Sequence, residues 1–144
     1  MTYAEVVEGV RAAIAAYTQA LDDGRTDDVV ATFCPDGSCD MPGMGSHAGH
    51  EALRRAYARW QPRQPQRHLV VNTLVTDWSE RYANAISDVV FVLLGEDGWT
   101  IQLVGRYHDA LRLDDGHWRF QSRTAEFVTP RRPSAGAQRQ AETR

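Results

Sequence analysis

The sequence predicts an α+β domain in which N-terminal helices pack on a curved antiparallel sheet and enclose a small-molecule pocket. Up to Trp60, apolar residues recur at three- and four-residue spacing, which is typical of amphipathic helices. Beyond Pro65, long β-prone segments follow one another with only short turns between them. Strands joined by such turns pair antiparallel, because parallel neighbours need a long crossover connection.

Length and composition indicate one folded unit. The chain has 144 residues, of which 42% are hydrophobic and 24% charged, close to the globular average. We expect a single domain over residues 1–128. Residues 129–144 carry prolines, a glycine and charges without an apolar period, so they are expected to form a disordered tail.

Charge and hydropathy exclude several classes of partner. The net charge is −3 and the arginines are scattered, so nucleic acid is not an expected partner. The chain has no apolar run near the ~20 residues that span a bilayer, and its N-terminus does not resemble a secretory signal. We therefore expect a cytoplasmic protein without membrane contact, in which Cys34 and Cys39 are reduced thiols.

The helical half divides at glycines and prolines. One helix is predicted from Ala4 to Leu21, a short second one from Asp27 to Phe33, and a third from Glu51 to Trp60. Between them, Ser38 to Met41 is predicted as a short strand. Residues 42–49 are rich in glycine and are expected to form an irregular loop at the rim of the pocket.

The second half reads as an antiparallel meander with four strands. Each break contains polar turn residues, two of them with glycine. The predicted strands are His68 to Trp78, Tyr82 to Leu94, Trp99 to Leu113 and His117 to Phe127. The outer sheet face would expose Val71, Val75 and Val104, so we expect a homodimer through that face.

Three stretches of the sequence, taken in order, carry a resemblance to a known family. They are Tyr17 with Ala20 to Gly24 and Phe33 to Gly37, then Arg67 and His68 with Asn72, then Gly105 to Tyr107 with Asp115 to Trp118. Together they resemble the SnoaL-like family of the nuclear transport factor 2-like fold. The resemblance implies a cone-shaped α+β barrel around a pocket. Because this fold hosts dehydratases, isomerases, cyclases and non-catalytic binding domains, it leaves the reaction open.

The resemblance to the scytalone dehydratase-like branch implies an acid–base pair. There a histidine on the first long strand works beside an aspartate at the end of the first helix, which correspond here to His68 and Asp22. A carboxylate fixes the tautomer of a neighbouring imidazole and leaves the ring ready to move a proton. Alternatively, Asp22 only caps the helix and His68 only begins a strand. The second catalytic histidine of that branch has no counterpart within Asp88 to Leu93.

Strand alternation places Leu103, Gly105, Tyr107, Asp109 and Leu111 on one face of their strand. On this face, Tyr107 is predicted to donate a hydrogen bond to a substrate oxygen, and Gly105 to leave space for substrate. Tyr107 can equally be a core aromatic residue. Asp88 and Asp109 lie within apolar strands, where a carboxylate needs a partner, and Arg106 and Arg123 are the expected ones.

The remaining candidates concern the lining of the pocket. An aromatic and thioether lining for a flat apolar ligand is predicted from Tyr17, Met41, Met44, Tyr57 and Trp60, which core packing would explain equally well. Asn72 is predicted as the last polar group of the pocket, able to orient His68 or hold a ligand oxygen. His47 and His50 are interpreted as part of a helix-entry loop, and no metal site is expected.

The leading hypothesis is an enzyme without a cofactor that acts on a small, mostly apolar cyclic or polyketide-like substrate. His68 would be the general acid or base, Asp22 its orienting partner and Tyr107 the oxyanion donor, in an isomerase, dehydratase or cyclase type of reaction. The alternative is a non-catalytic small-molecule-binding or assembly domain of the same fold, in which the outer sheet face matters more than the cavity.

Overall fold

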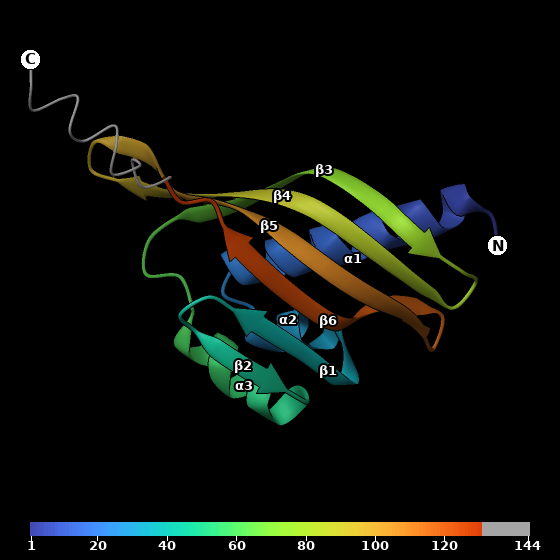
Figure 1. Cartoon of the computed structure of the whole chain (residues 1–144). Helices are drawn as coiled ribbons and strands as arrows, with labels where there is room; N and C mark the ends of the chain where they lie inside the picture. The colour runs from blue at the N-terminus through green and yellow to red at the C-terminus, as the bar shows by residue number, and fades with distance from the viewer. Residues whose placement is uncertain (131–144) are drawn as a thin grey trace, which may run out of the picture.

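The computed structural model describes residues 1–130 and consists of three helices and six strands (Figure 1). The elements, in chain order, are α1 (Tyr3–Asp22), α2 (Thr26–Ala31), β1 (Phe33–Met41), β2 (Gly45–Ala48), α3 (His50–Arg59), β3 (Gln66–Trp78), β4 (Tyr82–Gly95), β5 (Gly98–Asp114) and β6 (His117–Phe127). The predicted tail lies, except for its first two residues, outside the described residues.

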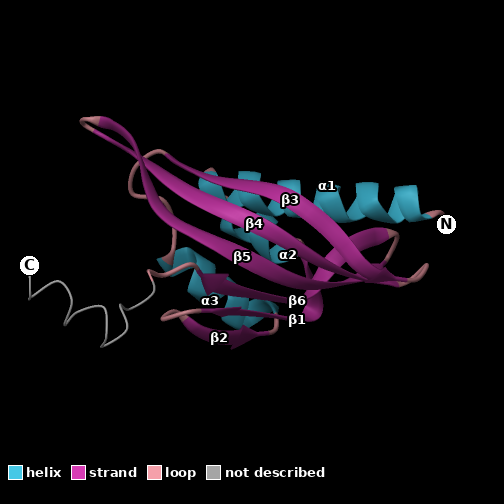
Figure 2. Ribbon diagram, turned by 45° about the horizontal axis from the view of Figure 1, so that its top comes forward, coloured by secondary structure: helices cyan, strands magenta, loops and turns pink. Residues whose placement is uncertain are grey.

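Helix α1 has clear boundary signals at both ends. Thr2 and Glu5 form a capping box at its start, in which each side chain accepts a hydrogen bond from the other's backbone N–H. At its end the chain turns through Gly24 at a φ of 71°, a left-handed conformation that glycine adopts without strain. The buried stripe of α1, including Val6, Val10 and Tyr17, covers one face of the sheet (Figures 1 and 2).

The six strands form one curved sheet in the order β2-β1-β6-β5-β4-β3. All neighbours are antiparallel except β1 and β6, which are parallel. The prediction of an antiparallel sheet is therefore wrong at this one junction. Parallel pairing is possible there because the chain from α3 to β5 lies between the two strands in sequence and serves as the crossover. The end strands β2 and β3 do not pair with each other, so the sheet is curved but not closed.

The region between α2 and α3 is more regular than predicted. Helix α2 ends at Ala31, and Phe33 already begins β1, which also includes the turn-like Pro35 to Gly37. Within the stretch predicted to be irregular, Gly45–Ala48 forms strand β2, paired antiparallel with β1. Gly43 and Gly45 have φ angles of 74° and 82°, so the glycines that suggested a loop make the hairpin turn instead.

A bulge in β3 reverses the faces of the strand. Gln66, His68 and Val70 turn toward the interior, whereas beyond the bulge Thr73 and Val75 do so. Asn72 lies at the bulge with a φ of 56°, and its side chain donates to Asp88 Oδ2 at 3.0 Å on the outer face. The predictions that Asn72 lines the pocket and that Val75 lies on the outer face are both wrong for this reason.

The core lies between the helices and the inner face of the sheet. The rings of Tyr17, Phe33, Tyr57 and Phe120 pack together with centroid distances between 5.4 and 6.1 Å. Both cysteines are buried free thiols. Among the helices described within residues 1–130, none is long and apolar enough to cross a membrane.

Candidate active site

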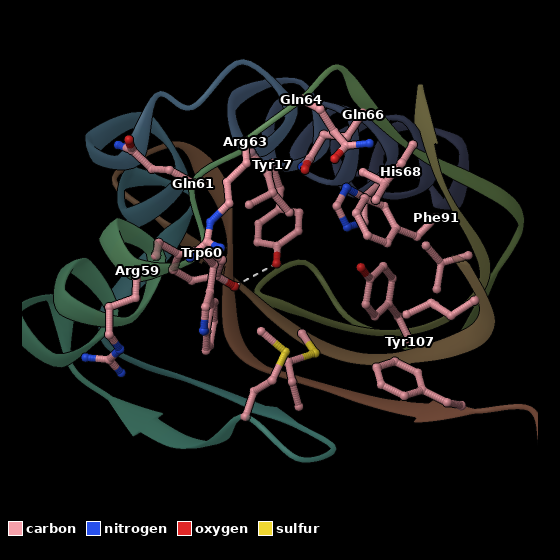
Figure 3. Close-up of a pocket in the computed structure, with 18 residues that line it drawn as sticks. Tyr17, Arg59, Trp60, Gln61, Arg63, Gln64, Gln66, His68, Phe91 and Tyr107 are labelled. Carbon is pink, nitrogen blue, oxygen red and sulfur yellow. Dashed lines mark hydrogen bonds between the residues drawn. The ribbon is translucent and has the colours of Figure 1, made fainter. Parts of the chain in front are cut away.

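A cavity of about 410 Å³ lies between the inner sheet face, α1, α3 and the linker that joins α3 to β3 (Figure 3). This volume suits a small organic molecule. Its apolar walls include Leu21, Val89, Phe91, Leu93, Leu103 and Phe127, and its mouth carries Arg59, Gln61, Arg63 and Gln64. The cavity is also lined by His68, by Tyr107 and by all five residues predicted as its aromatic and thioether lining, namely Tyr17, Met41, Met44, Tyr57 and Trp60.

Sheet register places His68 on the wall of this cavity. His68 is directly opposite Phe91 on β4, and Phe91 is opposite Leu103 on β5, so the three side chains form one row on the inner face. The imidazole stacks on the Phe91 ring, with a centroid distance of 4.4 Å and an interplanar angle of 19°. The stack restricts the orientation of the histidine ring.

Asp22 and His68 form a hydrogen-bonded pair at the edge of the cavity. The last residue of α1, Asp22, is 5% exposed, and its Oδ1 lies 2.6 Å from His68 Nδ1, whose ring is 15% exposed. Asp22 also accepts hydrogen bonds from the His68 backbone N–H at 2.8 Å and from Gln66 Nε2 at 3.1 Å. Because a carboxylate only accepts, Nδ1 carries the proton and the lone pair of the neutral ring is at Nε2.

Three contacts therefore fix one carboxylate and one imidazole in a single arrangement. The Nε2 atom of His68 makes no hydrogen bond within residues 1–130, and the ring lines the cavity, so this nitrogen is available to a ligand. Such a pair can take a proton from a bound molecule and return it.

Tyr107 lies on β5, two strands from His68, with its hydroxyl directed into the cavity (Figure 3). This hydroxyl makes no hydrogen bond to the rest of the described chain. Burial raises the pKa of Tyr107 from 10.0 to about 12, because the tyrosinate would lose its hydration, although the Arg123 guanidinium opposes the shift. At neutral pH the side chain is therefore a proton-bearing hydrogen-bond donor.

Behind Tyr107 lies a fully buried ion pair. Arg123 donates from Nε and Nη2 to the two oxygens of Asp109, both at 2.8 Å. Its guanidinium lies 3.9 Å from the Tyr107 ring centroid and 4.4 Å from that of Tyr17. Burial disfavours this charge, but Asp109 outweighs the cost and raises the pKa of Arg123. The pair fixes the position of two rings that line the cavity.

Both arginine partners expected for the strand carboxylates are found. Asp109 pairs with Arg123 inside the domain, whereas Asp88 pairs with Arg106 at 2.9 Å on the outer face. The residues predicted to share one face of β5 do so, and this is the inner face, since Gly105, Tyr107, Asp109 and Leu111 are buried.

A chain of hydroxyl and thiol groups crosses the cavity wall opposite His68. The hydroxyls of Tyr17 and Tyr57 are 2.6 Å apart, and that of Tyr57 donates to Cys39 Sγ at 3.4 Å. Burial raises the pKa of both tyrosines well above the ordinary value, so both stay neutral. While Tyr57 donates to Cys39, Tyr17 donates to Tyr57; if Tyr57 turns its single proton to Tyr17 instead, Tyr17 is able to donate to a ligand oxygen.

Two residues predicted for the site do not take the predicted role. Asn72 lies outside the cavity, as described for the β3 bulge. Gly105 is on the inner face, but the space beside its Cα is already filled: a Cβ there would lie 2.8 Å from Glu126 O and 3.0 Å from Phe127 Cδ1. Glycine at this position accommodates the Phe127 ring and the neighbouring strand, not a substrate.

Several cavity residues escaped the sequence reasoning. Gln66 is two residues before His68 on the same strand face, so alternation could have suggested it as a partner of the dyad. Leu103 shares its strand face with Tyr107 by alternation, whereas Phe91 reaches the cavity beside His68 through cross-strand register, which no local signal gives. His47 and His50 have structural contacts, since their Nε2 atoms lie 2.8 and 2.9 Å from the carbonyl oxygens of Met44 and Phe33.

Helices on a curved, open sheet around a cavity define a protein of the nuclear transport factor 2-like class. The sequence model of the SnoaL-like domain matches residues 2–124, and the chain belongs to this family. No curated protein sequence matches the chain significantly.

Solved structures have the same fold. A proposed aromatic ring hydroxylase from Novosphingobium aromaticivorans is 23% identical, with a TM-score of 0.80 and coverage of 90% of this chain and 94% of that chain. A proposed scytalone dehydratase from the same organism is also 23% identical, with a TM-score of 0.77 and coverage of 90% and 89%. A Catenulispora acidiphila protein in complex with S-DNPA is 25% identical, with a TM-score of 0.77 and coverage of 86% and 94%.

Proposed function

We propose that the protein is a cofactor-independent acid–base enzyme that acts on a small, largely apolar cyclic or polyketide-like molecule in the central cavity. The observation that carries the proposal is the Asp22–His68 pair, with its 2.6 Å contact at the wall of an apolar cavity and an Nε2 atom that makes no hydrogen bond within the described range. Apolar walls exclude water from bound substrate and strengthen the electrostatic interactions of the few polar groups.

In this mechanism, His68 Nε2 removes a proton from a carbon next to a substrate carbonyl, and the electron pair of the C–H bond moves to the carbonyl oxygen. Asp22 stabilises the resulting imidazolium through the Nδ1–H bond, and Tyr107 donates a hydrogen bond to the enolate oxygen. Return of the proton to another carbon gives isomerisation, whereas transfer to a leaving hydroxyl gives dehydration. Attack of the enolate carbon on a second carbonyl gives cyclisation.

The experiment that tests this proposal is proton exchange. The protein is incubated in D₂O with a panel of apolar cyclic ketones, and deuterium incorporation and any product are followed by mass spectrometry. We expect catalysed exchange that is lost in His68→Gln and reduced in Tyr107→Phe, with Tyr82→Phe, an exposed tyrosine, as the matched control. Ketone binding without exchange above the background rate would refute the acid–base role.

The alternative is a binding or assembly domain, which is favoured by an apolar row on the outer sheet face. Leu69, Val90 and Val104 are directly opposite one another on β3, β4 and β5, and Val71, in the next row, is 47% exposed. A second copy of the chain would cover this row, as proposed for a homodimer. Light scattering of the wild type and of Leu69→Lys tests it, because a dimer through this face should become a monomer in the variant.

A further inference from the structure

The charged residues that line the cavity are unusual for this chain. Acidic residues outnumber lysine and arginine by 19 to 16 in the whole sequence. Nevertheless, among residues 1–130 the two permanently charged side chains at the cavity, Arg59 and Arg63, are both cationic, and no carboxylate of this range lines it, since Asp22 lies behind His68. A concave site with charges of one sign attracts ligands of the opposite sign.

Arg63 lies at the mouth of the cavity, on the linker of residues 60–65 that joins α3 to β3 and is fixed at both ends. Pro62 and Pro65 restrict the backbone on both sides of it. Gln61 Nε2 donates to Thr26 Oγ1 at 2.9 Å and to Gly24 O at 3.3 Å, and Gln64 Nε2 donates to Leu94 O at 3.2 Å. The linker is thereby tied to the α1–α2 turn at one end and to β4 at the other, so the position of Arg63 does not depend on its own side-chain contacts.

The Arg63 guanidinium has no ion-pair or hydrogen-bond partner within residues 1–130, although eight other arginines of this range make at least one such contact. It extends from the linker toward Trp60, whereas Arg59 turns away from the cavity (Figure 3). Arg59 also has a structural reason to be basic, because it ends α3 and interacts with the helix dipole.

We propose that the ligand is an organic anion: its apolar ring fills the cavity, and its acidic group, a carboxylate, lies at the mouth beside Arg63. The ring would contact Trp60 and the apolar walls, and the far end would reach His68. The inference rests on the proposed use of the cavity for an apolar substrate and names the class of that substrate. A guanidinium suits this role because its planar set of donors matches the two oxygens of a carboxylate.

The test compares two probes that differ only in charge, a hydroxynaphthoate and the corresponding carboxamide, by calorimetric titration. We expect the wild-type protein to bind the acid at least about tenfold more tightly, as a charge-assisted contact provides. Raising the salt concentration from ~0.1 M to ~1 M should reduce this preference, because the Debye length falls from about 10 Å to about 3 Å.

Arg63→Gln should bring the ratio of the two dissociation constants to within about twofold of one. The matched control is Arg81→Gln, which removes the same charge at the far end of the β3–β4 hairpin and should leave the ratio unchanged. Equal binding of both probes by the wild type, failure of both to bind, or an unchanged preference in Arg63→Gln would overturn the inference. Deuterium exchange separates the two proposals, since a preference for the acid without exchange refutes the acid–base role alone.

Discussion

Replacement of Asp22 by asparagine tests the dyad most directly, because it changes one charge without changing size. Asp22 accepts from His68 Nδ1, from the His68 backbone N–H and from Gln66 Nε2. The backbone N–H cannot reorient, so the single oxygen of asparagine is expected to stay opposite it. The amide NH₂ group then faces Nδ1 and moves the imidazole proton to Nε2, where the ring can no longer accept a proton from substrate.

The magnitude follows from the lost hydrogen bond to a charged group. Such bonds contribute about 1.5–3 kcal/mol, and Asp22 is shielded from solvent, so the rate of exchange should fall by about 10- to 150-fold from this effect alone. The changed tautomer of His68 should reduce the exchange rate further. In Asp22→Asn, the amide NH₂ group faces other N–H donors at a buried site, which should also lower the free energy of unfolding by about 1–3 kcal/mol.

The assay measures deuterium exchange into a cyclic ketone at saturating concentration, alongside urea unfolding of the same preparations. The matched control is Asp23→Asn at the adjacent, more exposed position, which should exchange at the wild-type rate. If folded Asp22→Asn protein retained more than about half of the wild-type rate, Asp22 would not orient a catalytic base, and the proposed mechanism would be wrong.

Three further predictions concern the inner face of the sheet. Arg123→Met should destabilise the fold by about 3–5 kcal/mol, because Asp109 stays buried and unpaired, whereas combining it with Asp109→Leu should restore most of the loss in urea unfolding. An equally unstable double variant would contradict this. The pKa of Tyr107 is raised to about 12 in the folded protein, so its contribution to the free energy of unfolding is complete below pH 10 and falls by about 3 kcal/mol as the pH rises toward 12. Tyr107→Phe should flatten this part of the pH–stability profile, and an unchanged slope would contradict the raised pKa. Gly105→Ala should cost about 1–3 kcal/mol through contact with Glu126 O and Phe127, while Gly95→Ala, whose Cβ would be 3.9 Å from its nearest neighbour, should cost less; similar thermal midpoints would contradict the packing argument.

The sequence by itself determined the elements whose signals are local. The spacing of apolar residues in α1, and the turns between β3, β4, β5 and β6, located these elements to within two residues at most boundaries. A carboxylate inside an apolar strand needs a partner wherever the strand packs, which is why Arg106 and Arg123 could be predicted as partners of Asp88 and Asp109, whereas the structure decided which arginine pairs with which carboxylate. Asp22 and His68 were paired through the family resemblance, and the structure brings them within hydrogen-bond distance.

Only the tertiary structure decided the features that depend on register and on distant segments. Alternation could not show that Asn72 faces outward, because both faces of β3 are apolar and one bulged residue exchanges them. The parallel pairing of β1 with β6 joins segments about 80 residues apart in sequence. Likewise, Gly105 is a packing residue because Glu126 and Phe127 lie beside it, and the linker that carries Arg63 is tied by glutamine side chains to two distant elements. Local sequence encodes conformation, but the neighbours of a side chain are set by how the elements pack.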